Sequence, residues 1–414
     1  MIEKTSCIFE PYLEQKTIFK NKEVLRASYI PEVLPHRELE INQLASICVS
    51  ALKGETPSNV FIYGKTGTGK TAVTKYVGNE LLKRGQELGR KIIFIYINCE
   101  IVDTEYGVLS QIGNSIIQDW NDRIPFTGWP LDKVCTKLKE ELESSESTTV
   151  IALDEIDKLV AKSGDRILYI LTRMNSDMSK AKTSVIGISN DPRFTELLDP
   201  RVRSSLGEEE LIFPPYNASQ LQDILAQRAS LGFEENVLSD GVIPLCSALA
   251  AQEHGDARRA LDMLRVAGEL AERAGEQKVT EEHVRKARAK IELESMQKLI
   301  STLPLHSKVV LLSVILNEQV GNTKLITGEV YDTYKELVKR AKIDDLTQRR
   351  VSDLISELDM VGIINARVIS KGRYGRTKEI SLGVPLEEAK KVLEEDELIK
   401  ELSSYRPQRQ LTLV

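Results

Sequence analysis

Residues 64–71 read Gly64-Lys65-Thr66-Gly67-Thr68-Gly69-Lys70-Thr71 and match the pattern G-x-x-x-x-G-K-[ST]. The glycines let the backbone curl so that successive N–H groups, those of residues 67–69 among them, point at phosphate oxygens. Lys70 brings a cation to the β and γ phosphates of a nucleotide, and Thr71 offers a hydroxyl to Mg²⁺. The stretch therefore predicts a site for ATP or ADP with Mg²⁺.

The sequence on either side of this loop supplies the elements that phosphate binding requires. An apolar run at residues 60–63 predicts a strand before the loop, and residues 71–82 have a pattern compatible with a helix after it. A flexible glycine turn is the other interpretation of the motif. It does not account for the strand and helix that flank it.

Short apolar runs alternate with helical patterns from about residue 60 to residue 215. Five runs predict strands buried on both faces, at residues 59–63, 92–98, 149–153, 184–189 and 210–213. Pro214 and Pro215 end the last one, because proline supplies no N–H to a strand ladder. We expect a domain with a five-stranded parallel sheet covered by helices.

Two adjacent carboxylates follow the third predicted strand, in the stretch Leu153-Asp154-Glu155-Ile156-Asp157. Ligands of α/β sheets bind at the carboxyl ends of the strands, where these side chains would lie. We expect Asp154 to hold Mg²⁺ through water, and Glu155 to orient and deprotonate the water that attacks the γ phosphate. Without the phosphate loop, such a pair would more often be a solvated turn.

Further polar residues fall near the same edge. Asn190 follows the fourth strand and either caps a turn or hydrogen-bonds the attacking water. Arg201 and Arg203 precede the fifth strand and either form surface salt bridges or stabilise transition-state charge in a neighbouring subunit. Arg258 opens a helix after a glycine turn and either reaches back to the nucleotide or is solvated on the helix surface.

Together these motifs resemble the AAA+ ATPases. More narrowly, they resemble the archaeal replication initiators related to eukaryotic origin-recognition and cell-division-cycle helicase-loading proteins. Besides the Asp154 motif, the most specific stretches are Ile30-Pro31-Glu32-Val33-Leu34-Pro35-His36-Arg37-Glu38, Phe213-Pro214-Pro215-Tyr216 and Gly255-Asp256-Ala257-Arg258-Arg259-Ala260-Leu261-Asp262. The resemblance implies a P-loop AAA+ domain of α/β class, an α-helical lid and a C-terminal winged-helix domain.

The resemblance also implies roles for individual residues. The segment matching residues 29–37 surrounds the adenine, which makes Leu34, Pro35 and Arg37 candidates for base contacts, although Pro31 and Pro35 also suit an ordinary rigid turn. Tyr216 joins the nucleotide-binding set. Asn190 becomes the first sensor, Arg258 the second, and Arg201 the interfacial finger, with Arg203 as the reserve.

The C-terminal third predicts a DNA-reading element from its own residues. Thr347 is expected to cap a helix with an apolar stripe of Val351, Leu354, Ile355 and Leu358. Its other face carries Gln348, Arg349 and Arg350, which can meet base edges or phosphates. With a preceding helix at about residues 328–341, this predicts a helix-turn-helix.

A predicted hairpin follows, with strands at residues 363–370 and 377–382. Its tip carries Lys371, Arg373, Tyr374 and Arg376, and no acidic residue lies between Met360 and Lys378. A basic wing of this kind suits contact with DNA phosphates or the minor groove. Winged helices also bind proteins, and that alternative stays open.

Composition limits the remaining possibilities. The 414 residues carry 56 Lys plus Arg against 62 Asp plus Glu, a net charge of −6, so any DNA contact must be a local patch. No apolar run approaches the roughly 20 residues of a membrane span, and the N-terminus lacks a signal peptide. We expect a cytoplasmic, nucleoid-associated protein without membrane contact. Its expected domains are residues 1–215 (base), 216–294 (lid) and 295–414 (winged helix).

The sequence therefore favours an ATP-dependent replication initiator. By the resemblance, it binds duplex origin DNA, acts with the replicative helicase and with paralogous initiators, and hydrolyses ATP slowly as a switch. The alternatives are an AAA+ remodelling motor and a winged-helix transcription regulator stabilised by nucleotide. Residues 103–120, with apolar side chains every four residues, are a third candidate DNA contact or a packed helix.

Overall fold

The computed structural model describes residues 17–191, 193–207, 209–322, 324–370 and 376–407. The chain forms two compact units, Met1–Ala287 and Arg288–Val414. The division falls inside a single helix, α12 (Glu281–Ser301). The first unit holds the phosphate loop and the second holds the predicted DNA-reading element.

A parallel five-stranded sheet forms the centre of the first unit, in the order β2-β3-β4-β1-β5. Its strands are β1 (Val60–Tyr63), β2 (Ile92–Asn98), β3 (Thr148–Asp154), β4 (Lys182–Ser189) and β5 (Glu209–Ile212). The predicted sheet is confirmed, and each strand ends within two residues of its expected bounds.

The prediction that every strand is buried on both faces is wrong for the two edge strands: in β2 only Ile95 and Ile97 are buried, and β5 is more exposed still. Only Leu211 among its four residues is buried, and Ile212 is 63% exposed. β5 lies at the edge of the sheet and pairs with β1 alone. An edge strand is covered less completely than a central one, so apolar character does not ensure burial there.

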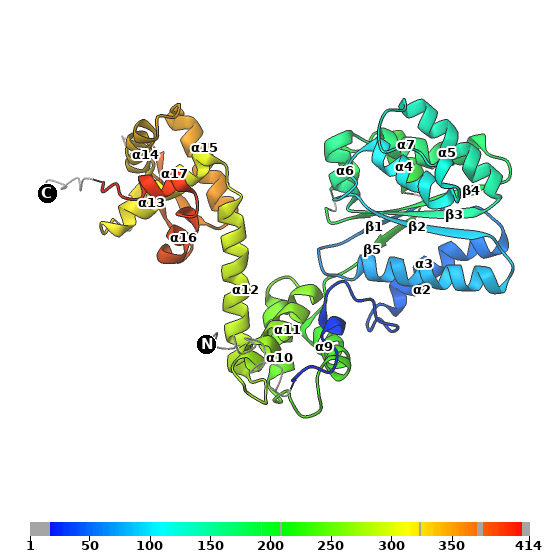
Figure 1. The fold of residues 1–414 in the computed structure, drawn as a ribbon, viewed down its shortest axis with the longest axis horizontal. Coiled ribbons are helices and arrows are strands. Elements are labelled where there is room, and N and C mark those ends of the chain that lie inside the picture. The colour runs from blue at the N-terminus through cyan, green and yellow to red at the C-terminus, as the bar shows by residue number, and fades with distance from the viewer. Residues whose placement is uncertain (1–16, 192, 208, 323, 371–375, 408–414) are drawn as a thin grey trace, which may run out of the picture. The chain divides into compact units, whose positions relative to one another are not determined.

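Helices cover both faces of the sheet (Figure 1). One face holds α2 (Glu38–Lys53) and α3 (Lys70–Glu87), and the other holds α4 (Glu105–Ile116), α5 (Leu131–Ser145), α6 (Ile156–Ser163) and α7 (Arg166–Arg173). α3 packs so closely on β2 that a Cβ at Gly78 would come within 2.4 Å of the Phe94 ring. Close packing fixes the helix that begins at the phosphate loop.

The expected helical region after β5 contains α9 (Ala218–Gly232), α10 (Val242–Gln252), α11 (Ala257–Arg273) and the start of α12. Asn217 begins α9 with a capping box. Its side-chain oxygen accepts from the Gln220 N–H, and its backbone N–H donates to the Gln220 side-chain oxygen. The N-terminal segment packs on these helices, because Arg228 donates to the carbonyls of Val24 and Tyr29. Part of the segment before the sheet therefore lies on the lid helices.

Only part of the segment at residues 103–120 is a helix, and that helix, α4, is partly buried. Val108 and Ile112 of α4 are fully buried, as helix packing predicts. α4 ends at Ile116, and Trp120 begins a short 3₁₀ helix with its side chain 75% exposed. The Arg123 guanidinium lies 4.6 Å from the centroid of the Trp120 ring.

The second unit packs around α13 (Leu305–Gln319), in which every residue from Val309 to Asn317 is buried. α14 (Thr327–Ala341), α15 (Gln348–Met360) and the hairpin of β7 (Ile364–Ser370) and β8 (Arg376–Leu382) follow. The predicted helix pair and hairpin are confirmed. A short third strand, β6 (Leu325–Ile326), and two terminal helices, α16 (Leu386–Leu393) and α17 (Glu397–Leu402), complete the unit.

Among the described residues, no helix has the length and apolar character needed to cross a membrane.

Candidate functional site

The phosphate loop joins β1 to α3 and has the backbone conformation that its glycines allow. Gly67 has φ 70° and Gly69 has φ 90°, values that L side chains rarely adopt. Between them Thr68 is fully buried, and its hydroxyl donates to the Lys65 carbonyl over 2.8 Å. This hydrogen bond within the loop therefore holds its curled conformation without a ligand.

Lys70 is the first residue of α3 and is 95% buried, with only 5% of its surface exposed. Its Nζ donates to the Gly64 carbonyl at 2.6 Å, to the Lys65 carbonyl at 2.7 Å and to Asn190 Oδ1 at 2.8 Å. Burial lowers the pKa of Lys70 to about 8, against the opposing effect of the Asp154 carboxylate. The geometry brings the predicted loop cation together with the predicted first sensor.

Thr71, the residue after Lys70, contacts Asp154 at the end of β3. The Thr71 hydroxyl donates to Asp154 Oδ2 over 2.6 Å. Tyr96 donates its hydroxyl to the same oxygen over 2.7 Å, and the Glu155 N–H donates to Asp154 Oδ1 over 3.0 Å. Hard cations such as Mg²⁺ take oxygen ligands, so this hydroxyl and carboxylate are of the right type for one.

Glu155 lies directly after β3 in the left-handed backbone region, with φ 55°. Burial raises the pKa of its carboxyl, and the nearby Glu100 carboxyl raises it further. Glu100 is held in its turn after β2 because its N–H donates to Asn98 Oδ1 over 2.8 Å. A raised pKa suits a carboxylate that accepts a proton from water.

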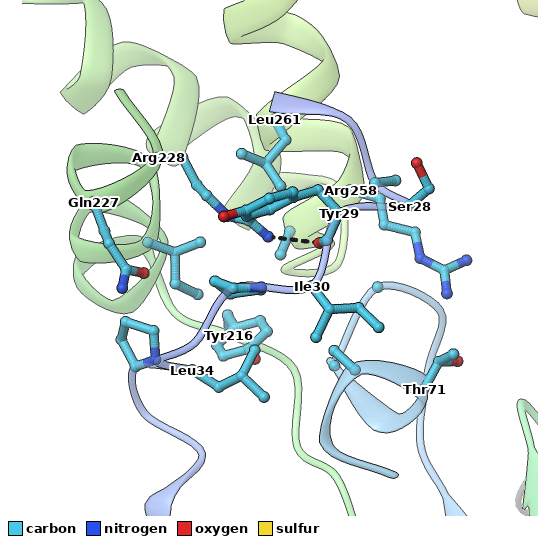
Figure 2. Close-up of a pocket in the computed structure, with 18 of the residues that line it drawn as sticks. Ser28, Tyr29, Ile30, Leu34, Thr71, Tyr216, Gln227, Arg228, Arg258 and Leu261 are labelled. Carbon is cyan, nitrogen blue, oxygen red and sulfur yellow. Dashed lines mark hydrogen bonds between the residues drawn. The ribbon is translucent and has the colours of Figure 1, made fainter. Parts of the chain in front are cut away.

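The start of α11 touches the phosphate loop. The Ala257 N–H donates to the Gly67 carbonyl over 3.2 Å. Asp256 caps the helix by accepting from the N–H groups of Arg258 and Arg259, and it lies so close that a Cβ on Gly67 would meet its carboxylate. Figure 2 shows the exposed Arg258 side chain on the same side of the cavity as Thr71.

Arg37 is only 2% exposed and lies behind the phosphate loop. Its Nε donates to the Thr68 carbonyl at 2.9 Å, one terminal nitrogen donates to the Pro214 carbonyl at 2.6 Å, and the other pairs with Glu40 at 3.1 Å. The guanidinium carbon lies 3.9 Å from the centroid of the Tyr216 ring. Arg37 faces the backbone of the loop and does not line the cavity described next.

A cavity of about 340 Å³ opens between the loop, the N-terminal segment and the lid helices (Figure 2). Two kinds of group line it: loop and helix residues that suit phosphates, and apolar side chains that suit a planar base. The first are Gly67, Gly69, Thr71, Lys75 and Arg258, and the second include Ile30, Leu34, Pro35, Tyr216, Ile224 and Leu261. Leu34, Pro35 and Tyr216, which the sequence predicts near the base, are thus brought together.

Arg201 and Arg203 lie apart from this cavity, on α8 (Pro200–Leu206). Both are exposed. Arg201 makes two hydrogen bonds to the Asp199 carboxylate, at 3.0 Å and 3.2 Å. The Arg203 side chain has no hydrogen bond or ion pair to any described residue, and only its backbone is bonded, to Asp199 and Gly207. Arg203 is therefore the more available of the two for a neighbouring subunit.

The predicted DNA-reading residues lie at the start of α15, in the second unit. Thr347 caps the helix, its hydroxyl accepting from the Arg350 N–H. Gln348, Arg349 and Arg350 are all exposed. Arg350 pairs with Glu357 over 3.3 Å. The Arg349 side chain has no hydrogen bond or ion pair to any described residue.

A groove of about 470 Å³ lies between α15 and the hairpin. Its lining includes Gln348, Arg349, Ser352, Thr377 and Lys378. Lys378 is tied to α15, because its ammonium donates to the Ser352 carbonyl over 3.0 Å and to the Ser356 hydroxyl. Lys371, Arg373, Tyr374 and the side chain of Arg376 lie outside the described residues.

Three site residues were missed by sequence reasoning: Tyr96, Glu100 and Lys75. Tyr96 and Glu100 come from β2 and the turn after it, which lie beside β3 because Asn98 is in register with Asp154. Lys75 lies one turn beyond the loop, with its ammonium 3.8 Å from the centroid of the Tyr96 ring. The signal that could have found Tyr96 and Glu100 was polar residues on and just after the strand predicted at residues 92–98.

Comparisons with known proteins cover nearly the whole chain. Family models match in three consecutive stretches: the AAA ATPase domain at residues 33–186, the Cdc6 AAA+ ATPase-type lid domain at 222–289 and the CDC6 C-terminal winged helix domain at 298–392. These matches confirm the predicted fold class of AAA+ domain, lid and winged helix.

Relatives that match over nearly their whole length point to the same family. An ORC1-type DNA replication protein of Thermococcus kodakarensis is 58% identical over 408 residues, 99% of this chain and 98% of that protein. A second of the same description, from Methanosarcina mazei, is 57% identical over 96% of each chain. The solved structure of the Aeropyrum pernix ORC1 protein in complex with DNA is 47% identical, with TM-score 0.83 over 94% of this chain and 100% of that one.

Proposed function

Because the chain belongs to the family of ORC1-type DNA replication proteins and carries an AAA ATPase domain, we propose that its nucleotide acts as a switch on binding to duplex origin DNA. Bound ATP favours the DNA-binding form, and slow hydrolysis to ADP resets it. The observation that carries this proposal is the buried Lys70 ammonium, hydrogen-bonded to Asn190 beside the Thr71–Asp154 pair.

The nucleotide is held by the loop and the cavity. The N–H groups of Gly67, Thr68 and Gly69, together with Lys70, bind the phosphates, while Leu34, Pro35 and Tyr216 enclose the base. Arg37 does not contact the nucleotide; it fixes the loop backbone by donating to the Thr68 carbonyl. Thr71, and Asp154 through water, would hold Mg²⁺, which would neutralise phosphate charge.

Hydrolysis uses carboxylates and cations already placed around the loop. Glu155 takes a proton from the attacking water, and its raised pKa favours that transfer. Asn190 orients the water, and Arg258 stabilises phosphate charge from the lid. A second copy of the chain completes the site with Arg201 or Arg203; the unpaired state of Arg203 favours the latter.

DNA binding uses the second unit. The exposed Gln348, Arg349 and Arg350 at the start of α15 enter a groove of the duplex. Lys371, Arg373, Tyr374 and Arg376 of the hairpin tip contact phosphates. The 47% identical structural relative solved in complex with DNA supports DNA binding by this chain.

We also propose the domains and partners that the resemblance implies. We keep the boundaries at residues 1–215, 216–294 and 295–414, since the proline pair at 214–215 and the division near residue 287 lie close to them. The proposed protein partners are the replicative helicase and paralogous initiators. A nucleoid-associated place in the cytoplasm suits that role.

Two substitutions test the nucleotide site on which the switch depends. Lys70→Ala removes the phosphate cation and should abolish ATP binding, while Glu155→Gln should keep ATP binding and block turnover. Lys83→Ala, on the same helix but exposed, is the matched control and should leave both unchanged. Affinity is measured by calorimetric titration and turnover by phosphate release. Equal ATP affinity for wild type and Lys70→Ala would overturn the site.

A further inference from the structure

Tyr96 of β2 contacts the carboxylate that is proposed to face Mg²⁺, yet the proposed mechanism gives it no task. Its hydroxyl donates to Asp154 Oδ2 over 2.7 Å. The Thr71 hydroxyl donates to the same oxygen over 2.6 Å, and the Glu155 N–H donates to Oδ1 over 3.0 Å. An ionised carboxylate offers about four acceptor positions. Among the described residues, these contacts fill all of the Asp154 positions but one, which is on Oδ1.

These donors differ in their relation to the nucleotide cavity. Thr71 lines the cavity, and while its proton is directed at Asp154 its oxygen keeps lone pairs for a metal ion. Tyr96 is not among the residues that line the cavity. It comes from the strand beside β3 and reaches the carboxylate from within the sheet. Tyr96 therefore acts on Asp154 without needing access to the ligand.

The Tyr96 side chain is held in place from two directions. Its backbone is paired with Ala152, two residues before Asp154, so the side chains of Tyr96 and Asp154 lie on the same face of the sheet. On that face the Lys75 ammonium of α3 lies 3.8 Å from the centroid of the Tyr96 ring, close enough to attract it. Burial raises the pKa of the Tyr96 hydroxyl, and the Asp154 charge raises it further. The hydroxyl therefore keeps its proton and remains a donor.

We propose that Tyr96 is a positioning residue for Mg²⁺, whose hydroxyl fixes the orientation of the Asp154 carboxylate and thereby strengthens cation binding beside Thr71. A carboxylate that is free to turn must be ordered when the cation binds, and that ordering costs conformational entropy. A carboxylate that is already held avoids this cost. The inference rests on the proposed nucleotide site and adds to it a residue that sets how strongly ATP binding depends on Mg²⁺.

The test removes the hydroxyl and keeps the ring. ATP binding to full-length wild type and Tyr96→Phe is measured by calorimetric titration, once with saturating Mg²⁺ and once in EDTA. In EDTA the two proteins should bind ATP equally, since Tyr96 does not line the cavity. The gain in ATP affinity on adding Mg²⁺ should be smaller in Tyr96→Phe by roughly tenfold, the low end of what partners that orient metal-binding side chains contribute.

Two further comparisons make the result specific. Tyr63→Phe is the matched control, because the Tyr63 hydroxyl also donates to a carboxylate, that of Glu210, over 3.1 Å. It should keep the wild-type gain from Mg²⁺. A double-mutant cycle asks whether Tyr96 acts through Asp154. Asp154→Ala should reduce the gain, and adding Tyr96→Phe to it should reduce the gain no further.

The outcomes separate this inference from the nucleotide site itself. If Tyr96→Phe keeps the wild-type gain from Mg²⁺, Tyr96 does not position the carboxylate. If it lowers ATP affinity equally with Mg²⁺ and in EDTA, its role is structural only, and the inference is again overturned. In both cases loss of ATP binding in Lys70→Ala would leave the phosphate site standing. ATP affinity unchanged by Lys70→Ala would instead overturn the site, and the inference with it.

Discussion

The guanidinium of Arg37 joins three segments that are far apart in the sequence. It donates to the carbonyl of Thr68 in the phosphate loop, to that of Pro214 after β5, and to Glu40 at the start of α2. The resemblance places Arg37 beside the adenine. In the structure its side chain instead holds the buried side of the phosphate loop. A residue can therefore affect nucleotide binding without lining the cavity.

Replacing Arg37 by alanine should destabilise the first unit. The change leaves the Glu40 carboxylate and two carbonyls buried without their donor, which typically costs about 3–5 kcal/mol. Arg37→Lys should not rescue it, because an ammonium cannot reproduce the planar set of donors. Thermal unfolding with and without ATP measures the effect, and Arg84→Ala, an exposed ion-pair residue on α3, is the control. An unchanged Tm would contradict this role.

Lys70 makes the site sensitive to pH. Burial lowers the pKa of its ammonium to about 8 in the ligand-free protein. Phosphate binding favours the charged form, so above pH 8 the site must take up a proton in order to bind. ATP affinity should be flat below about pH 8 and fall above it, by up to roughly tenfold per pH unit.

The matching control is Lys70→Arg. Its guanidinium stays charged throughout this range, so its ATP affinity should be weaker but free of the decline above pH 8. Titrations from pH 6.5 to 9.5, about three units around the Lys70 value, measure both. A decline of the same size in Lys70→Arg would assign the pH dependence to another group.

At this scale, prediction from sequence depends on distance along the chain. Lys70 and Thr71 follow from a local motif, and Asp154 from its place after a strand. Tyr96 does not follow, because it reaches Asp154 only through the β2–β3 register.

Among the elements, α11 and α15 carry the contacts on which the proposed function depends. α11 meets the phosphate loop with its N-terminus, where the Ala257 N–H donates to the Gly67 carbonyl. Because the N-terminus of a helix favours negative charge, α11 is placed to respond when phosphates occupy the loop. α15 presents Gln348 and Arg349 at its own N-terminus, beside the groove that the hairpin forms.

Removing Arg349 should weaken duplex binding. Arg349→Ala takes away an exposed guanidinium that no described residue pairs. If Arg349 contacts a base, binding falls by about 1–3 kcal/mol and specificity relaxes; if it contacts a phosphate, all duplexes weaken and the salt slope falls by about one. Lys391→Ala, exposed on α16, is the control. Unchanged affinity and slope would exclude α15 from the DNA contact.

The elements were easier to predict than the side-chain contacts. Periodicity placed the sheet strands and the helix pair of the second unit, because both depend on local apolar patterns. α16 and α17, of eight and six residues, were missed, since so short a segment offers little periodicity. The exposure of β5 was mispredicted because edge position depends on strand order, which local sequence does not contain.

For the whole molecule, family membership decides among the three functions that the motifs allow. A DNA replication protein related over nearly the full chain accounts for both an AAA ATPase domain and a winged helix. A remodelling motor gives no reason for the terminal winged helix, and a transcription regulator gives none for the Glu155 and Asn190 arrangement. The coupling of nucleotide state to DNA binding is the claim that remains to be tested.

The most direct test is binding of the full-length protein to a library of fragments from its own genome, with ATP and with ADP, at physiological salt. The proposal predicts enrichment of one or a few repeat-bearing intergenic loci, stronger with ATP and reduced by Arg373→Ala together with Arg376→Ala. Absence of enrichment in both nucleotide states, alongside rapid ATP turnover, would contradict the initiator switch and favour a motor.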